Sequence, residues 1–222
     1  MEPIRQPIPP LPPIPEAAPQ PSGETRVPIH MVMATAEHDA LLMLRVREGD
    51  SASFTALAER HRRPVIHYLY RMTGHQGVAE ELAQEVFLRV YRSRESYEPT
   101  AKFTTWLYRI TTNLALNSIR DAKGEKGQAS LDERSGEGGM AIQVADGVAN
   151  AEQRLVSESR LDEVRQAIQA LPENQRAAVV MHKYQELGYG QIAEALGCTV
   201  PAVKSLLFRA YETLRARLAH LS

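Results

Sequence analysis

The chain of 222 residues lacks most features that mark secreted, membrane or disulfide-rich proteins. Its single cysteine, Cys198, rules out a disulfide framework and argues against a cysteine-based metal site. No run approaches the roughly 20 apolar residues that a membrane-spanning helix needs. No basic segment followed by an apolar stretch marks a secretory signal. These absences predict a protein of a reducing compartment, the cytoplasm, with no membrane insertion.

Catalytic and cofactor-binding patterns are also scarce. The seven histidines form no cluster, and no Ser/His/Asp or Cys/His arrangement can be identified. Residues 188–193 fit a GxGxxA string, but no strand-like segment precedes them, so a dinucleotide site is not expected. The sequence therefore predicts a protein that is not an enzyme and that needs no cofactor or metal.

The chain also lacks a clear excess of positive or negative charge. The 26 Lys and Arg residues nearly balance the 27 Asp and Glu residues, which gives a net charge of -1. Mildly basic segments at 37–123 and 159–222 flank an acidic segment at 124–158. A protein that binds DNA unaided usually carries a stronger basic excess. If this chain binds DNA, its charge suggests help from a partner.

Proline and glycine divide the chain into blocks. Ten of the 14 prolines lie in residues 1–28, where their fixed φ and missing backbone donor disfavour helix and central strand. We expect a disordered proline-rich tail over 1–36. Six of the 13 glycines lie in 124–151, which predicts a flexible acidic linker there. Two candidate domains remain, at 37–123 and 152–222.

The apolar residues of both blocks recur at helical spacing, and no alternating run of strand length appears. The sequence therefore predicts an all-α fold of two small helical domains. The expected helices lie at about 37–48, 52–73, 77–93, 103–121, 152–170, 172–185, 189–196 and 200–219. Ser51 is the expected N-cap of the second helix, and Pro64 should kink that helix.

The helix over 78–91 has two contrasting faces. Val78, Leu82, Val86 and Val90 form one apolar stripe, which should face the core. The opposite stripe mixes charged, amide and aromatic side chains, as protein interfaces do. Its members are Glu80, Gln84, Phe87 and Tyr91. Spacing alone leaves open whether the two aromatic residues bind a partner or lie under a neighbouring helix.

The helix over 103–121 also has two faces. Phe103, Leu107, Ile110 and Leu114 make an apolar stripe. A second stripe comprises Trp106, Arg109, Asn113, Asn117 and Arg120. Arginine neutralises phosphate, asparagine pairs with base edges, and tryptophan offers a stacking surface, as a reader of single-stranded DNA needs. An ordinary core tryptophan with solvated polar neighbours would give the same spacing, and both interpretations stay open.

A helix-turn-helix is predicted near the C-terminus. A short helix over 189–196 ends at Gly197, and a longer helix follows with Pro201 in its first turn. The face expected to be buried comprises Val203, Leu207, Ala210, Leu214 and Leu218. The outward face carries Ala202, Lys204, Ser205, Phe208 and Arg209. Such a face favours entry into a DNA major groove over a helical hairpin without a DNA role.

Taken together, the chain resembles the extracytoplasmic-function (ECF) sigma factors of bacterial RNA polymerase. The resemblance covers roughly residues 40–121 and 152–219. It rests on the segments Phe54-x-x-Leu57, 79–87 (AEELAQEVF), 103–113 (FTTWLYRITTN), Leu171-Pro172-x-x-x-Arg176 and 202–210 (AVKSLLFRA). Each segment is moderately specific, and their order and spacing are highly specific.

The resemblance implies three sets of contacts. The implied core-polymerase-binding residues are Glu80, Glu81, Gln84, Glu85, Phe87 and Tyr91. The residues implied to hold the opened -10 element of the promoter are Lys102, Thr105, Trp106, Arg109, Asn113, Asn117 and Arg120. The residues implied to read the -35 element are Thr199, Ala202, Lys204, Ser205, Phe208 and Arg209.

The resemblance implies a sigma factor that directs core RNA polymerase to promoters. Its expected partners are core RNA polymerase, promoter DNA and an anti-sigma factor. The alternative is a stand-alone helix-turn-helix regulator of operator DNA, which would bind DNA tightly without polymerase.

The helix-turn-helix departs from the family pattern at two places. Gly188 and Gly190 stand where the family has a capped helix start. Ala202, Leu206 and Tyr211 stand in the second helix where the family often has Thr and basic residues.

Overall fold

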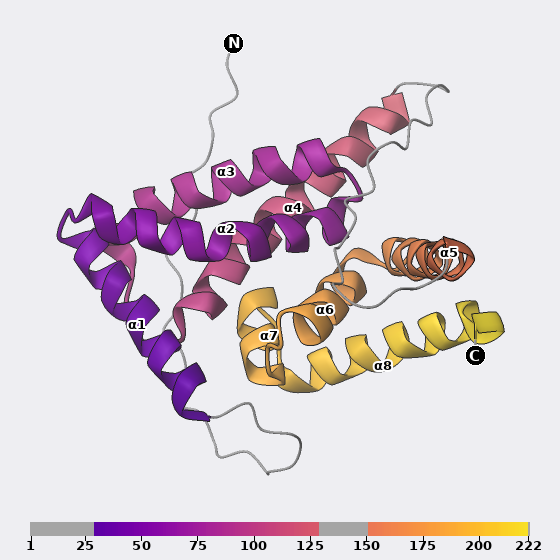
Figure 1. The fold of residues 1–222 in the computed structure, drawn as a ribbon. Coiled ribbons are helices and arrows are strands. Elements are labelled where there is room, and N and C mark those ends of the chain that lie inside the picture. Colours follow the sequence, from indigo (N-terminus) through magenta and orange to yellow (C-terminus); the bar gives the residue numbers. More distant parts are fainter. Residues whose placement is uncertain (1–28, 129–150, 222) are drawn as a thin grey trace.

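The computed structural model describes residues 29–128 and 151–221 of the chain. In this part, helices are the only regular secondary structure, as the sequence predicts (Figure 1). The helices are α1 (Ile29–Arg47), α2 (Ser51–Thr73), α3 (Gln76–Arg92), α4 (Phe103–Gln128), α5 (Ala151–Gln169), α6 (Glu173–Tyr184), α7 (Tyr189–Leu196) and α8 (Val200–Arg217), with 3-10 turns η1 (Arg94–Ser96) and η2 (Ala219–Leu221). No helix in the described ranges is long and apolar enough to cross a membrane.

The first four helices form an N-terminal unit. Helix α2 packs on α1, α3 and α4, and its apolar face supplies a large share of the core. The largest fully buried side chains of this unit include Tyr68, Tyr97, Phe103 and Met43. The buried Tyr68 hydroxyl lies 2.8 Å from the Thr112 hydroxyl on α4, which satisfies a polar group that would otherwise cost free energy.

A buried carboxylate fixes α1 against α2. Asp39 is almost fully buried, forms an ion pair with Arg60, and lies 2.8 Å from Nε2 of His61. Burial raises the pKa of Asp39, but the hydrogen bonds and charges of His61 and Arg60 outweigh it and leave this pKa below its ordinary value. The carboxylate therefore stabilises the N-terminal unit in its ionised form.

Helices α5 to α8 form a C-terminal unit around α6. All residues from Ala177 to Met181 are buried, so α6 is the central helix of this unit. Helix α7 ends at Gly197, whose left-handed φ of 63° reverses the chain. The Thr199 hydroxyl caps α8, which buries Val203, Leu207 and Ala210 as predicted. Leu214 and Leu218, near the end of the helix, are only half-buried.

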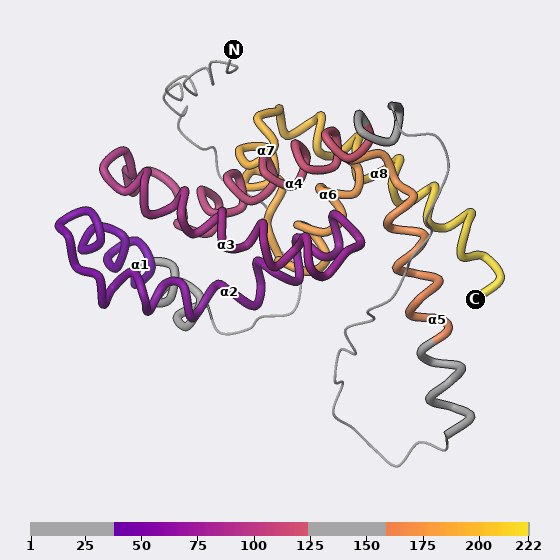
Figure 2. Tube along the Cα trace, turned by 90° about the horizontal axis from the view of Figure 1, so that it is seen from above, coloured from indigo at the N-terminus to yellow at the C-terminus, as the bar shows by residue number. Residues whose placement is uncertain are grey.

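The two units pack directly on each other. Helix α7 lies beside α4, and α6 and α5 contact α2, as both views show (Figures 1 and 2). Buried residues of the two units form one continuous apolar cluster. The sequence pattern gave no indication of this contact.

Several helix boundaries differ from those expected. Helix α1 begins at Ile29, inside the expected tail, and α4 runs on to Gln128, inside the expected linker. The N-cap of α2 is Asp50 and not Ser51, because Oδ1 of Asp50 accepts the backbone N–H of Ala52 at 2.9 Å. Pro64 lies inside α2 and does not end it. The rest of the predicted tail and linker, residues 1–28 and 129–150, lies outside the described residues.

Candidate nucleic-acid and protein interfaces

The polar stripe of α3 is open to solvent over its first two turns. Glu80, Glu81 and Gln84 are exposed, whereas Glu85 is half-buried and its Oε1 lies 2.8 Å from Nε of Arg89. The exposed residues present two carboxylates and one amide without a nearby apolar cover. This arrangement leaves them available to a partner surface.

The aromatic residues of α3 are partly covered. Phe87 packs on the core as a half-buried side chain, and Tyr91 makes an edge contact with Phe54 of α2, with ring centroids 5.1 Å apart. Tyr91 nevertheless stays 40% exposed. Leu88, four residues after Gln84, is 49% exposed and adds an apolar contact to the same side of the helix. Its spacing of four residues from Gln84 is the sequence signal that places Leu88 on this side of the helix.

The buried face of α3 is rotated relative to the one predicted. Ala79, Ala83, Val86 and Val90 are buried, while Val78 and Leu82 are only half-buried. Helix α3 packs on both α2 and α4, and small residues on its buried face permit close approach of a neighbouring helix, which accounts for the burial of the two alanines.

Helix α4 presents the predicted stripe, which we call the α4 ridge: Trp106, Arg109, Asn113, Asn117 and Arg120. Phe103, Leu107 and Leu114 on the opposite side are buried, and Ile110 is half-buried. Trp106 is half-buried in an aromatic cluster, with its ring 5.1 Å from that of Tyr97 and 6.0 Å from that of Phe103. The indole of Trp106 is thus half-buried against the aromatic core and half open to solvent, and its contact with DNA stays a prediction.

The remaining residues expected at the -10 element fall into two groups. Lys102, Asn113, Asn117 and Arg120 are exposed. Thr105 is buried, and its hydroxyl accepts a hydrogen bond of 3.2 Å from Nε2 of Gln191 on α7. Thr105 is therefore not accessible to DNA in this arrangement of the units, and its contact with the -10 element stays a prediction.

Arg109 lies at the same contact between α4 and α7. It is half-buried, and burial lowers its pKa, an effect that the carboxylate of Glu194 on α7 opposes. Burial likewise raises the pKa of Glu194, and the charge of Arg109 opposes that shift. The two groups therefore influence each other's charge across the contact between the units.

The outward face of α8 matches the predicted one closely. Lys204, Ser205, Phe208 and Arg209 are exposed and line one shallow hollow, and Phe208 is 68% exposed. Ala202 is half-buried, and Thr199 is exposed while its hydroxyl accepts the backbone N–H of Ala202 at 3.4 Å. Two cations beside an exposed aromatic ring give a surface that can neutralise phosphate and contact the methyl group of thymine.

The glycine-flanked start of α7 is held by a glutamine. Oε1 of Gln191 accepts the backbone N–H of Gly188 at 3.0 Å, although glycine offers no side chain to complete a reciprocal cap. The amide of Gln191 thus stabilises α7 at one end and contacts Thr105 at the other. The Gln191 side chain thus satisfies a backbone N–H at the helix start where glycine replaces the capping residue of the family pattern.

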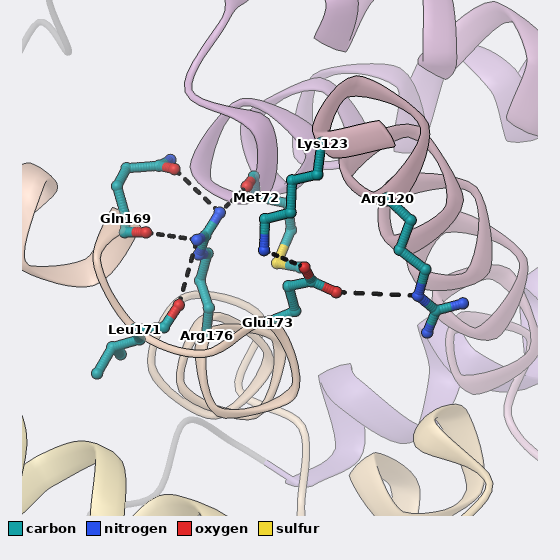
Figure 3. A network of polar contacts seen from close by, with 7 residues as sticks. All are labelled: Met72, Arg120, Lys123, Gln169, Leu171, Glu173 and Arg176. Carbon is teal, nitrogen blue, oxygen red and sulfur yellow. Dashed lines mark hydrogen bonds and ion pairs between the residues drawn. The ribbon is translucent and has the colours of Figure 1, made fainter. Parts of the chain in front are cut away.

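A polar network joins the two units at the far end of α4 (Figure 3). Arg176 donates to the backbone carbonyl of Met72 at the end of α2, and also to the carbonyls of Gln169 and Leu171 within its own unit. Nε2 of Gln169 donates to the carbonyls of Arg71, at 2.6 Å, and Tyr70. These side chains bind carbonyls in the last turn of α2, where helix-terminal carbonyls lack partners in a following turn; the carbonyl of Tyr70 also accepts the backbone N–H of Gly74 at 2.8 Å.

An acidic residue joins α6 to the end of α4 in the same network. Oε1 of Glu173 lies 2.6 Å from Nζ of Lys123, and Oε2 lies 3.9 Å from Nε of Arg120 (Figure 3). The sequence indicated Arg176 only as part of the Leu171-Pro172-x-x-x-Arg176 segment and indicated no role for Glu173. Their partners lie 50 to 104 residues away in the chain, so local spacing could not reveal them.

Comparison with known proteins gives the class of the chain. Residues 57–125 match the family Sigma-70 region 2, and residues 161–214 match the family Sigma-70, region 4. The chain is 35% identical over 181 residues to the ECF RNA polymerase sigma factor SigW of Bacillus subtilis (strain 168), covering 80% of this chain and 95% of SigW.

Two solved structures share the fold. CnrH, in its complex with the cytosolic domain of CnrY, has a TM-score of 0.62 at 19% identity and covers 83% of this chain and 99% of that one. The sigma factor RpoE from Bartonella quintana, in complex with the anti-sigma factor NepR, has a TM-score of 0.58 at 17% identity and covers 75% of this chain and 96% of that one.

These matches define a two-region transcription initiation factor of the sigma-70 type. The chain belongs to the ECF sigma factors, and it functions in the initiation of transcription by RNA polymerase. The alternative of a stand-alone helix-turn-helix regulator is not favoured, because the N-terminal unit also matches its own sigma region.

Proposed function

We propose that three separate faces divide the work of this sigma factor. The stripe of α3 binds core RNA polymerase, the α4 ridge holds the opened -10 strand, and the outward face of α8 reads the -35 duplex. The observation that carries this proposal is the separation of the exposed polar residues onto three helices, each backed by an apolar face. The factor works in the cytoplasm as a binding protein without chemistry of its own.

The near-zero net charge supports the need for core polymerase. Phosphate contacts by Lys and Arg supply most of the affinity of DNA-binding proteins, and this chain has no basic excess. The free protein should therefore bind promoter duplex weakly at physiological salt, and the holoenzyme should bind it well. Sub-micromolar, sequence-specific binding of operator DNA by the free chain would instead favour the stand-alone regulator.

A pull-down with purified core polymerase tests the α3 stripe. The variant carrying Glu80→Lys and Gln84→Ala should lose core binding while keeping its fold, because both side chains are exposed. Glu59→Lys reverses one charge at an exposed site of α2 and serves as the control. Equal affinity of the double variant and the control for core polymerase would reject the assignment of this face.

We also propose an anti-sigma factor as a regulator of this chain. The complex of RpoE with NepR supports this, since that sigma factor shares the fold. Affinity purification of the tagged chain from its host should recover a stoichiometric protein that inhibits run-off transcription when added back. Recovery of the chain with core polymerase alone, under both growing and stressed conditions, would contradict this proposal.

A further inference from the structure

A hollow of about 320 Å³ lies where the middle of α2 meets the end of α6. Its lining comprises Arg63, Pro64, His67 and Arg71 of α2, together with Tyr184 and Gln185. A volume of this size is at the lower end of the range for sites that hold small molecules. The α3 stripe, the α4 ridge and the outward face of α8 contribute none of these residues. The hollow is therefore separate from the three faces of the proposed function.

Three basic side chains line one side of the hollow. Arg63, His67 and Arg71 follow one another at intervals of four residues, so they lie on one face of α2. Burial lowers the pKa of the half-buried His67, and the charges of Arg71 and Arg63 lower it further. Among the ion pairs of the described residues, none includes any of these three side chains. The hollow thus carries positive charge that no carboxylate of the described chain offsets by direct contact.

The polar groups around the hollow are mostly hydrogen-bond donors. Nη1 of Arg71 donates to the backbone carbonyl of His67 at 3.2 Å, and its guanidinium lies over the ring of Tyr184, 4.0 Å from the centroid. A guanidinium has five N–H groups and no acceptor, so Arg71 is held in place with donors to spare. Oε1 of Gln185 accepts the hydroxyl hydrogen of Tyr108, which leaves the NH₂ group of this amide to donate to a ligand. A ligand for this hollow must therefore supply acceptors and negative charge.

The second wall of the hollow is fixed by its backbone. The N–H groups of Gln185 and Leu187 both donate to the carbonyl of Met181 at 3.2 Å, and Leu187 is buried. Between them, Glu186 has a left-handed φ of 52°, which a residue with a side chain rarely adopts. Strained positions of this kind persist where the surrounding structure holds them, and they are common beside binding sites. A wall that is set before a ligand arrives lowers the free-energy cost of binding.

We propose that this hollow binds the diphosphate group of a small phosphorylated molecule, such as a nucleoside diphosphate. Arg63 and Arg71 are eight residues apart, which is about 12 Å along the helix axis. A diphosphate carries more negative charge and more terminal oxygens than a single phosphate, so it matches cations spread over two turns. Arginine binds phosphate oxygens through pairs of charge-assisted hydrogen bonds. The ring of Pro64 and the partly exposed ring of Tyr184 offer apolar contact to the rest of the molecule.

The proposed ligand contacts both units of the chain. The basic side chains belong to α2 of the N-terminal unit, whereas Tyr184 and Gln185 belong to the C-terminal unit. A ligand that binds the folded, packed arrangement stabilises it by mass action. Binding should therefore raise the thermal midpoint of the full chain as the ligand concentration rises.

Isothermal titration calorimetry on the full chain tests the site with three probes: inorganic diphosphate, adenosine diphosphate (ADP) and inorganic phosphate. Diphosphate and ADP should bind at least about 10-fold more tightly than phosphate, since they offer more charge-assisted hydrogen bonds. Both should also raise the thermal midpoint. Dissociation constants weaker than roughly 1 mM for diphosphate and ADP would overturn the proposal.

Variants on the two walls locate the bound ligand. Arg63→Gln should weaken the binding of diphosphate about 10-fold or more, because it removes a charge-assisted bond. Arg62→Gln removes the same charge from the next, exposed residue, which does not line the hollow, and should leave the affinity nearly unchanged. Gln185→Glu keeps an acceptor for the Tyr108 hydroxyl but places a negative charge at the second wall, so it should also weaken binding about 10-fold or more.

Three outcomes of these titrations contradict the proposal. Equal losses in Arg62→Gln and Arg63→Gln would indicate a general attraction of anions to α2. An unchanged affinity in Gln185→Glu would place the ligand outside the hollow. Displacement of ADP by a single-stranded -10 oligonucleotide at equal phosphate concentration would assign the hollow to nucleic acid in place of a small molecule.

Discussion

The division between strand opening and duplex reading can be tested with two exposed side chains. Asn113 lies on the α4 ridge, and Arg209 lies on the outward face of α8. Because both are exposed, replacing either with alanine should change the free energy of unfolding by less than about 0.5 kcal/mol. Any larger effect on transcription must then come from lost contacts with DNA.

The expected magnitudes follow from the contacts that each side chain can make. An Asn or Arg that pairs with a base edge contributes about 1–3 kcal/mol, which corresponds to about 5- to 150-fold in binding. Asn113→Ala should therefore slow open-complex formation within this range. Arg209→Ala should lower promoter binding within the same range, but only on promoters that need a -35 element.

Pre-melting the promoter distinguishes the two defects. A template mismatched across the -10 element no longer requires unpairing and unstacking, which cost a few kcal/mol for a flipped base. This template should rescue part of the loss in Asn113→Ala and none of the loss in Arg209→Ala. Permanganate footprinting and run-off transcription on duplex and pre-melted templates measure both effects. An equal response of the two variants to pre-melting would refute the assignment of the two faces.

Three further substitutions test the fold and the -35 face. Asp39→Asn should lower the free energy of unfolding by about 1–3 kcal/mol at pH 7. Because the pKa of Asp39 is depressed in the folded state, this difference from the wild type should shrink as the pH falls below about 4 and through that pKa. Urea titrations at several pH values measure the change. Phe208→Ala should weaken holoenzyme binding to -35-dependent promoters without changing the thermal midpoint, whereas equal binding would remove Phe208 from that face. Leu107→Ala should cost about 2–5 kcal/mol in denaturant unfolding, because this side chain is fully buried in the core; a loss below about 1 kcal/mol would contradict that packing.

The features that depend on local spacing were predictable from the sequence. The period of 3.6 residues gave the buried face of α4 through Phe103, Leu107 and Leu114, and that of α8 through Val203 and Leu207. The same rule placed the exposed residues of the α8 face correctly. The apolar pattern of a single helix determines such a face, so the face can be predicted without knowing which helix covers it.

Errors arose where a neighbouring element decides the outcome. The burial of Thr105 comes from α7, and the sequence gives no sign of that contact. The rotated core face of α3 reflects close packing against α2, which favours Ala79 and Ala83 over the larger Val78 and Leu82. Asp50 and Ser51 are both good N-caps by residue type, and the extended backbone of Asp50, with its carboxylate bound to the N–H of Ala52, separates them.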